Sequence, residues 1–539
     1  MSSNLLSSAL SGLVAFQRSL DTTSHNIANV NTEGYSRQRA ELATKPAEYI
    51  GVGFLGKGVN VENITRVYDQ FVNNQLRSSA SAFGEVDKFH ELSSQIDNTI
   101  ADDSIGISPA INSFFNAVND VADDPTSITA RQVMISETES LVQNFNTIGN
   151  QFGNANDQVN TDLTFIVDEV NTIASSIAEL NLSIISDVGR SSGRQEPNDL
   201  IDRRDLLLLR LAEKVDVSVL DQQDGSVSVF IGKGQALVLA GTAKELSLEN
   251  SAINPSQKEI HMNGQDISKQ LSGGEITGIL RFRDEVLTPV QQQLGFLAAG
   301  LAIEFNELHN TGFDLNGVAG ADIFSFGSPE IPVVDLVSAA GGTVTASYKS
   351  SAENLEATDY RVDFSSPTAF TITRLSDNST VLPIDVGFDL ALTGTLTAGD
   401  QFFIRPTFQV AKNITSQLTD PKAIAASQSA STLPGDNRIA LELAGLRTAT
   451  TLSGGSTSFS QAYEQLVGNV ATATQSARVS RSAQEALYNQ AREARENVSG
   501  VNLDEEAANL IKFQNAYQAA AQAVSISRTI FDTLLGATS

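Results

Sequence analysis

The chain has 539 residues, 41% of them hydrophobic, so it holds apolar material for about three or four packed domains and is not a disordered chain. Its formal net charge of −28 argues against nucleic acid and anionic membranes as partners, and solvated acidic faces explain the charge best. The absence of cysteine excludes disulfides, thiolate metal sites and a cysteine nucleophile.

The N-terminus does not fit a cleaved signal peptide. Its first cation is Arg18, and no continuous apolar stretch follows the start of the chain. No apolar run approaches the ~20 residues of a membrane span. Composition by itself therefore indicates a cytosolic protein without a membrane segment, and it leaves open an export route that needs no cleaved signal.

The first thirty residues predict an amphipathic helix that ends in a turn. Apolar residues recur at steps of three and four, which is the a/d spacing of a coiled-coil seam. The seam positions are Leu6, Ala9, Leu13, Phe16, Leu20, Thr23, Ile27 and Val30. The stretch that follows, with Asn29, Asn31, Gly34 and Tyr35, has the composition of a turn.

A long helical region is expected after a short extended stretch. Residues 35–41 alternate in hydrophobicity, and residues 59–61 form a short strand pattern. Separate helical segments are expected from Tyr68, from Pro109 and from Thr126, and over residues 159–188 and 199–214.

Two β regions interrupt the helical pattern. Residues 215–230 alternate around Asp224-Gly225, which predicts a hairpin. Helical spacing returns over residues 275–309. A second β region over residues 331–406 has short strands separated by Gly, Pro, Asn and Ser, which fit a small sandwich or barrel.

The C-terminal part is predicted to be helical, resuming near Pro421 and at residues 437–446. Ser458 and Gln461 fit a capping box ahead of a long helix to Val498. Asn502 is expected to cap the last helix. The seam of that helix is Leu503, Glu506, Leu510, Phe513, Tyr517, Ala520, Val524, Ser527, Phe531 and Leu534.

These elements predict a mainly α fold with inserted β modules. Long coiled-coil-like terminal helices, a discontinuous helical bundle domain and outer β domains are expected. The expected domains are a terminal helical assembly domain (1–66 and 499–539), a helical bundle domain (67–213, 276–320 and 411–498), a first β module (214–275) and a second β module (321–410).

No residue cluster predicts catalysis, a cofactor or a metal ion. His25, His90, His261 and His309 lie far apart and lack metal-ligand spacing. Residues 51–56 match G-x-G-x-x-G, but a strand pattern follows them where a nucleotide site would have a helix. We therefore expect no enzyme and no cofactor.

The two terminal seams are too weak to form a core of their own. Thr23, Glu506 and Ser527 occupy seam positions and help little. The apolar residues of Leu6–Val30 release less free energy than the ordering of about 25 backbone residues costs. We therefore expect both ends to order only against other chains, as in an assembly protein whose termini fold on polymerisation.

Both ends resemble the axial proteins of the bacterial flagellum, most closely the family of flagellar hook-associated protein 1. The N-terminal motif of that family is close to N-I-A-N-V-N-T-P-G-Y-S-R-Q, and residues 26–38 read N-I-A-N-V-N-T-E-G-Y-S-R-Q. Residues 500–521 resemble its C-terminal motif, and residues 305–317 and 435–437 are also similar. Glu33 replaces the usual proline, so Gly34 must supply the turn through a positive φ. In the two β regions we recognise no motif of that family.

The resemblance implies a secreted structural protein of the flagellum, exported unprocessed by the flagellar type III apparatus and placed at the hook–filament junction. It implies four partners: further copies of itself in a helical ring, hook protein, hook-associated protein 3, and a cytoplasmic export chaperone on the C-terminal helix. The implied assembly residues are Leu6, Leu13, Phe16, Leu20, Ile27, Asn29, Val30, Asn31, Gly34, Tyr35, Leu503, Leu510, Phe513, Tyr517, Val524, Phe531 and Leu534. The implied chaperone-binding residues are Leu510, Phe513, Tyr517, Val524 and Phe531.

Two alternatives stay open. One is another axial protein, but flagellin lacks the Tyr-Ser-Arg-Gln turn and hook protein carries mostly β structure between its helices. The other is an enzyme or adhesin housed in an outer β module, although residues 331–406 contain no catalytic cluster.

Overall fold

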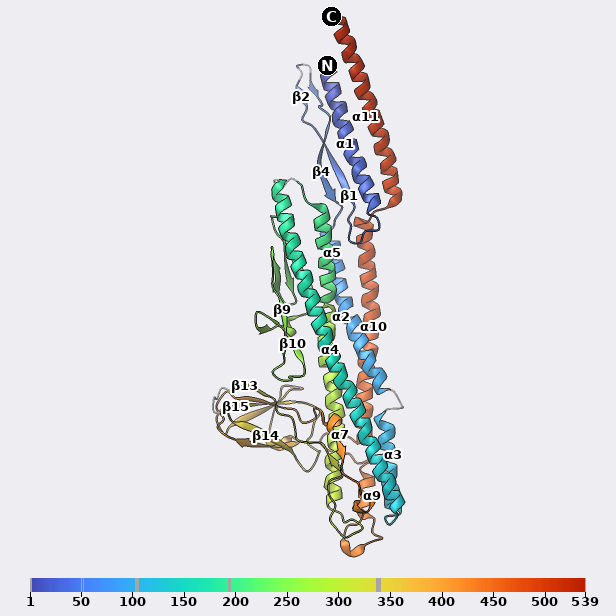
Figure 1. The fold of residues 1–539 in the computed structure, drawn as a ribbon, viewed down its shortest axis with the longest axis vertical. Coiled ribbons are helices and arrows are strands. Elements are labelled where there is room, and N and C mark those ends of the chain that lie inside the picture. The colour runs from blue at the N-terminus through green and yellow to red at the C-terminus, as the bar shows by residue number, and fades with distance from the viewer. Residues whose placement is uncertain are drawn as a thin grey trace.

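The computed structural model describes residues 2–49, 51, 53–101, 106–191, 195–335 and 341–538. These residues form an elongated molecule in which both termini lie at one end (Figure 1). Long helices run along the molecule, with a β ribbon at the end that carries the termini and two further groups of strands beside the helices. This arrangement confirms the predicted fold class, mainly α with β modules inserted between helices.

The end that carries both termini is a two-helix pair with a β ribbon, which we call the terminal module. Helix α1 (Ser2–Ala28) runs antiparallel to helix α11 (Leu503–Thr538) (Figure 1). The ribbon consists of β1 (Gln38–Thr44), β2 (Glu48–Tyr49), β3 (Phe54–Leu55) and β4 (Val59–Arg66). The sequence predicted only an extended stretch and a three-residue strand here. The strands are longer because β1 and β4 pair along their whole lengths.

The body is a bundle of helices around one large core. Its main helices are α2 (Gln70–Ile100), α3 (Ile107–Asp123), α4 (Ile128–Arg190), α5 (Asn198–Lys214), α6 (Gly274–Phe282), α7 (Thr288–Asn310), α9 (Arg438–Gly445) and α10 (Phe459–Ser499); a π-helical turn at Arg283–Leu287 joins α6 to α7, and α8 (Val410–Asn413) is short. α2 packs along α10 and α6, and α4 packs along α3 and α5. Phe114, Leu163 and Ile177 are among the residues fully buried between them.

Two helix predictions are wrong in their extent. α4 is one continuous helix of 63 residues, whereas separate segments were expected from Thr126 and over residues 159–188. It is continuous because no proline interrupts residues 128–190 and its buried side chains follow one face throughout. The helix expected near Pro421 is a single 3-10 turn. The predicted capping box of Ser458 and Gln461 is confirmed.

The first group of strands lies against α4. A four-stranded sheet contains β5 (Val217–Asp221), β6 (Val227–Ile231), β7 (Gln235–Leu239) and β8 (Thr242–Ala243), and a three-stranded sheet contains β9 (Leu246–Asn250), β10 (Lys258–Met262) and β11 (Gln265–Asp266). The predicted hairpin at Asp224-Gly225 is confirmed, with Gly225 at a φ of 84°.

The second group of strands projects sideways from the body (Figure 1). A five-stranded sheet in the order β13-β19-β15-β16-β17 packs against the pair β14-β18. The strands are β13 (Val333–Asp335), β14 (Thr343–Tyr348), β15 (Tyr360–Phe364), β16 (Phe370–Arg374), β17 (Thr380–Val381), β18 (Phe388–Thr393) and β19 (Gln401–Ile404); β12 (Phe324–Ser325) pairs separately with β20 (Thr415–Ser416). The sequence predicted a small sandwich or barrel for this region. In the described part of the chain the two sheets form a sandwich and no closed barrel.

One stretch, Gly274–Asn310, has the length and composition of a membrane-crossing helix, and 72% of its most apolar window is buried. Because its side chains pack inside the bundle, it is explained as the core helix of the body. The domain boundaries expected from the sequence stay a prediction that limited proteolysis can test.

Candidate assembly interface

The two predicted seams face each other in the terminal module. Most of their apolar side chains are half-buried, α1 packs along α11, and Gly12 lies opposite Ala520. The half-buried residues are Leu13, Phe16, Leu20, Ile27, Val30, Leu510, Phe513, Tyr517 and Val524. Leu6, Leu503 and Phe531 are exposed, and the side chain of Leu534 lies outside the described residues. Packing of α1 against α11 therefore buries the two seams only in part.

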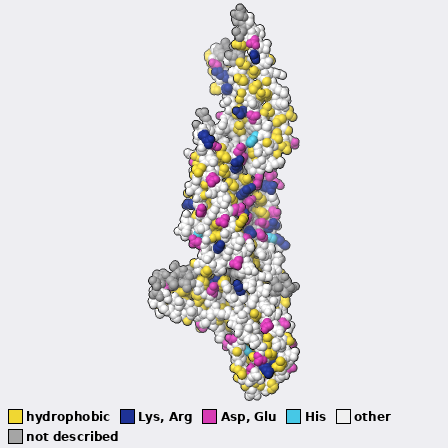
Figure 2. Space-filling model, in the orientation of Figure 1, with side chains coloured by type: hydrophobic (Ala, Val, Ile, Leu, Met, Phe, Trp, Pro, Cys, Tyr) yellow, Lys and Arg dark blue, Asp and Glu magenta, His cyan; other side chains and the backbone are white. Residues whose placement is uncertain are grey.

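A second set of apolar side chains in the terminal module faces solvent, and the seam pattern did not reveal it. Its members are Leu5, Leu10 and Val14 on α1, Leu42, Tyr49, Phe54 and Leu55 on the ribbon, and Ile511, Ile526 and Ile530 on α11. Hydrophobic side chains gather over this end of the molecule (Figure 2). Leu6, Leu10 and Val14 follow one another at intervals of four residues, which places them on one face of the helix. This spacing could have predicted a second apolar stripe. Exposed apolar patches of this kind mark interaction surfaces.

Asn26 ties the end of α1 to the strand that follows it. Its Oδ1 accepts hydrogen bonds from Tyr35 Oη at 2.8 Å and from Gln38 N at 2.9 Å. Its Nδ2 donates to Gln38 O at 2.9 Å and to Glu506 Oε2 at 3.1 Å. All four bonds are buried, so one amide fixes the turn, the strand and the last helix together. Sequence reasoning placed Asn26 in the motif but gave it no role.

Glu506 is the second centre of this network, although it had been expected to help little. Its side chain is 2% exposed, and its Oε1 accepts from Arg37 Nε at 2.7 Å. Arg37 also donates to Glu505 at 2.7 Å. The seam position holds a carboxylate because a buried carboxylate is tolerated where hydrogen bonds compensate its charge.

The same turn is bonded to the body. Asp202 of α5 accepts from Ser36 N at 3.1 Å and from Arg66 at 2.8 Å, and Arg66 also donates to Asp205 at 2.8 Å. Burial raises the pKa of Asp202, while the Arg66 guanidinium works against that rise. From α10, Arg495 donates to Gly34 O at 3.0 Å and to Tyr35 O at 3.2 Å. The motif is thus a joint between the terminal module and the body.

The turn keeps its predicted conformation without proline. Tyr35 N donates to Thr32 O at 3.2 Å, and Gly34 adopts a φ of 79°. A side chain on Gly34 would also meet Leu206. Glu33 forms a surface ion pair with Arg210 of α5 at 2.9 Å. This ion pair connects the turn to α5 in addition to the bond between Ser36 and Asp202.

A large polar cleft lies beside this joint. Its volume is about 1230 Å³, and its walls come from both the terminal module and the body. It is lined by residues 30–35 of the turn, Leu76 and Arg77 of α2, Leu206 of α5, Arg495 of α10 and residues 500–505. Asn31 and Gly34, predicted as interface residues, therefore lie at an open surface.

Comparisons with known proteins match the two ends and the middle of the chain separately. Residues 6–35 match the family described as "Flagella basal body rod protein", and residues 495–537 match "Flagellar basal body rod FlgEFG protein C-terminal". Residues 93–324 match "Flagellar hook-associated protein FlgK helical domain", and residues 337–406 match "Flagellar hook-associated protein 1, D2-like domain". Matches at both termini define an axial protein of the bacterial flagellum.

Relatives that match along their full length show which kind of axial protein the chain resembles. The chain is 33% identical to flagellar hook-associated protein 1 of Escherichia coli (strain K12), over 99% of each chain. It is 33% identical to the protein of that name in Salmonella typhimurium, over 99% of each chain, and 26% identical to that in Bacillus subtilis (strain 168), over 98% of this chain and 97% of the relative. The solved structure of the flagellar hook junction protein FlgK from Burkholderia pseudomallei shares the fold, with a TM-score of 0.71, 23% identity, and coverage of 79% of this chain and 100% of that one.

The chain belongs to the flagellar hook-associated protein 1 family. It is a structural component of the bacterial flagellum, where it assembles with hook-related proteins. The resemblance found in residues 26–38 and 500–521 is confirmed, and the alternative of another axial protein, flagellin or hook protein, is not supported.

Proposed function

We propose that the protein is secreted through the flagellar type III apparatus and forms the layer that joins hook to filament. In this layer each subunit contacts further copies of itself, hook protein on one side and hook-associated protein 3 on the other. The exposed apolar surface of the terminal module is the observation that supports the proposal most directly, because a surface of this kind needs neighbours. We expect no catalytic activity in either β module.

The assembly residues divide into two groups by position. Phe16, Leu20, Phe513 and Tyr517 lie between α1 and α11 and hold the pair together. Leu6, Leu503 and Phe531, together with the exposed stripe of Leu10 and Val14, face outward and are available to neighbouring subunits. Asn29, Asn31, Gly34 and Tyr35 set the angle at which the pair leaves the body.

The chaperone is proposed to bind the seam face of the C-terminal helix. Leu510, Phe513, Tyr517 and Val524 are half-buried against α1, whereas Phe531 is exposed. Chaperone and α1 would therefore compete for one face, and release of the chaperone would free that face for pairing with α1.

A matched pair of variants tests the chaperone contact. Leu510→Ala with Phe513→Ala should weaken binding to the purified cytoplasmic chaperone at least tenfold, because both side chains lie on the shared face. Ile511→Ala with Ile526→Ala removes two exposed apolar side chains from the outer face of α11 and should leave the affinity unchanged. Equal losses in the two variants would place the chaperone elsewhere, as would binding that survives deletion of residues 503–534.

Cells without this protein test the position in the flagellum. They are expected to make hooks that carry no filament and to lose filament protein into the medium. Filaments of normal number and length in such cells would contradict the junction role. Peptidase or glycosidase activity in the purified protein would contradict the purely structural reading.

A further inference from the structure

A hairpin of the first group of strands gathers one histidine and several carboxylates, far from the terminal module. Strand β10 ends at Met262, the two-residue turn Asn263-Gly264 follows, and β11 begins at Gln265. Asn263 has a φ of 53° and Gly264 a φ of 75°, the combination that a type I′ hairpin turn requires. This turn fixes the register, so His261 pairs directly with Asp266.

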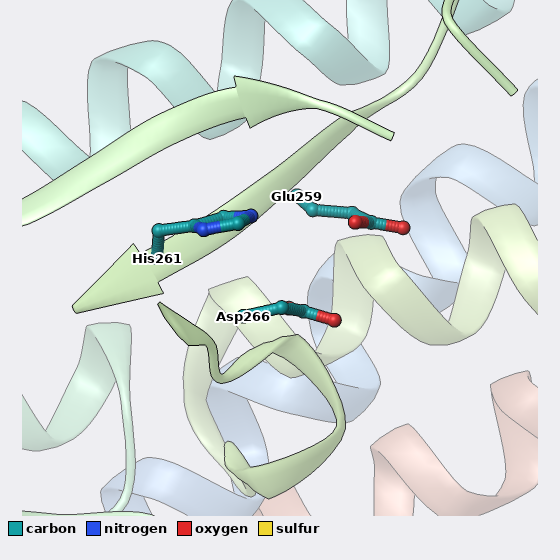
Figure 3. Close-up of side chains that lie close together, drawn as sticks. All are labelled: Glu259, His261 and Asp266. Carbon is teal, nitrogen blue, oxygen red and sulfur yellow. The ribbon is translucent and has the colours of Figure 1, made fainter. Parts of the chain in front are cut away.

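Strand alternation brings a third ligand to the same face. Ile260 and Met262 are buried beneath the sheet, so Glu259 and His261 share its outer face. One side-chain ligand atom from each of Glu259, His261 and Asp266 lies within 4.8 Å of the other two. Figure 3 shows the imidazole of His261 pointing toward the Glu259 carboxylate, with the Asp266 carboxylate nearby.

A fourth carboxylate lies behind the histidine. Oε2 of Glu249, on strand β9, is 3.6 Å from Nδ1 of His261. That nitrogen is buried and has no hydrogen-bond partner in the described part of the chain, and the side chain is 13% exposed. At 3.6 Å this carboxylate is too far for a hydrogen bond. A shift of about 0.5 Å would let Nδ1–H donate to it, which leaves Nε2 free and orients the ring as the outer carboxylate does in histidine–metal sites.

The carboxylates of this face repel one another, although Asp266 Oδ1 accepts a hydrogen bond from Ser268 N at 2.8 Å. Glu259 and Glu249 are directly opposite in the β9–β10 register, an arrangement that destabilises a sheet when both residues are charged. No lysine or arginine forms an ion pair with Glu249, Glu259 or Asp266 in the part of the chain that the structure describes. A bound divalent cation would remove this repulsion.

We propose that Glu259, His261 and Asp266 bind a zinc ion, with Glu249 positioning the histidine. Imidazole and carboxylate ligands suit Zn²⁺, and water completes a tetrahedral set around three protein ligands. Bonds of about 2.0–2.2 Å require the ligand atoms to draw together by roughly 1 Å. The carboxylates of Glu259 and Asp266 can make this movement, since Asp266 is exposed and Glu259 half-buried.

The proposed ion would join β10 to β11 from outside in a chain that has no cysteine for a disulfide. Its ligands come together only when the hairpin is formed, so binding would add to the stability of the folded β module.

Isothermal titration of the full-length, chelator-treated protein with ZnCl₂ tests the proposal. We expect one saturable site per chain and a rise in the unfolding temperature on addition of zinc. His261→Ala and the nearly isosteric Asp266→Asn should abolish the site. Glu249→Gln should weaken it about 10–100-fold, as loss of an outer carboxylate does. His90→Ala, which removes a half-buried histidine on α2, should leave it unchanged.

Saturable binding that persists in both His261→Ala and Asp266→Asn would overturn the proposal, and so would the lack of any saturable binding to the unmodified protein. Equal affinities for Ca²⁺ and Zn²⁺ would also overturn it, because they would indicate a general acidic surface without a histidine ligand. Far-ultraviolet circular dichroism of each variant checks that the fold is kept.

Discussion

The terminal module and the body are both built from long amphipathic helices, yet they bury their apolar faces very differently. In the body, α4 buries Phe145, Leu163 and Ile177 completely. Among the side chains that the structure describes, α11 has no fully buried apolar residue, and its buried side chains are Glu506 and Ser527. The body is therefore a closed core, whereas the terminal module leaves much of its apolar surface exposed to solvent.

The largest expected effect is the loss of stability when a leucine of the body is replaced by alanine, compared with the same replacement in the terminal module. Leu163→Ala should lower the free energy of unfolding by about 2–5 kcal/mol, because it leaves a cavity in a closed core. Leu510→Ala should lower it by less than about 1 kcal/mol, because solvent already reaches that side chain and the terminal helices contribute little to the stability of the monomer. Urea unfolding of the monomer measures both values, and equal losses would remove the distinction between the regions.

A second effect belongs to the body alone. His309 Nδ1 donates to Ala321 O at 2.7 Å, and its Nε2 accepts from Ala425 N at 2.7 Å, so the ring is neutral. Burial lowers the pKa of His309 to about 4. Between pH 6.5 and 4 the unfolded chain binds a proton that the folded chain does not, so the stability of the body falls across this range as pH falls, by up to about 3 kcal/mol.

Comparison of His309→Gln with the unmodified protein isolates this contribution. The variant should be less stable at pH 7 but should lose less stability between pH 6.5 and 4, as measured by urea unfolding at several pH values. His90→Gln is the control and should follow the unmodified protein. A full pH-dependent loss in His309→Gln would assign the acid sensitivity to other groups.

A smaller effect is expected at the joint between the two regions. Glu506→Ala leaves Arg37 Nε and Asn26 Nδ2 without one acceptor each, which should ease the opening of the joint by about 1–3 kcal/mol. Glu505→Ala removes an exposed partner of the same arginine and should change it by less than about 1 kcal/mol. Hydrogen exchange of residues 26–38 measures this opening. Equal exchange rates in the two variants would contradict the claim that Glu506 stabilises the joint more than Glu505 does.

Local patterns in the sequence predicted the features that depend on near neighbours. The seams, the capping box of Ser458 and the positive φ of Gly34 all follow from residues within a few positions of one another. The joint was missed because Asn26 and Glu506 are 480 positions apart, and nothing near Glu506 indicates that Arg37 will reach it. The cluster at His261 was missed for a related reason: its ligands become neighbours only when the Asn263-Gly264 turn and the β9–β10 pairing fix the register.

Limited proteolysis of the dilute monomer tests most directly whether the terminal module is an unfinished core. Both termini should be trimmed early, and a fragment from about Arg66 to Val498 should resist digestion, because only the body buries its apolar faces fully. Addition of preformed hooks or of further subunits under assembling conditions should protect the ends. Termini that resist digestion as long as the body does, in a monomer without partners, would contradict this view of the molecule.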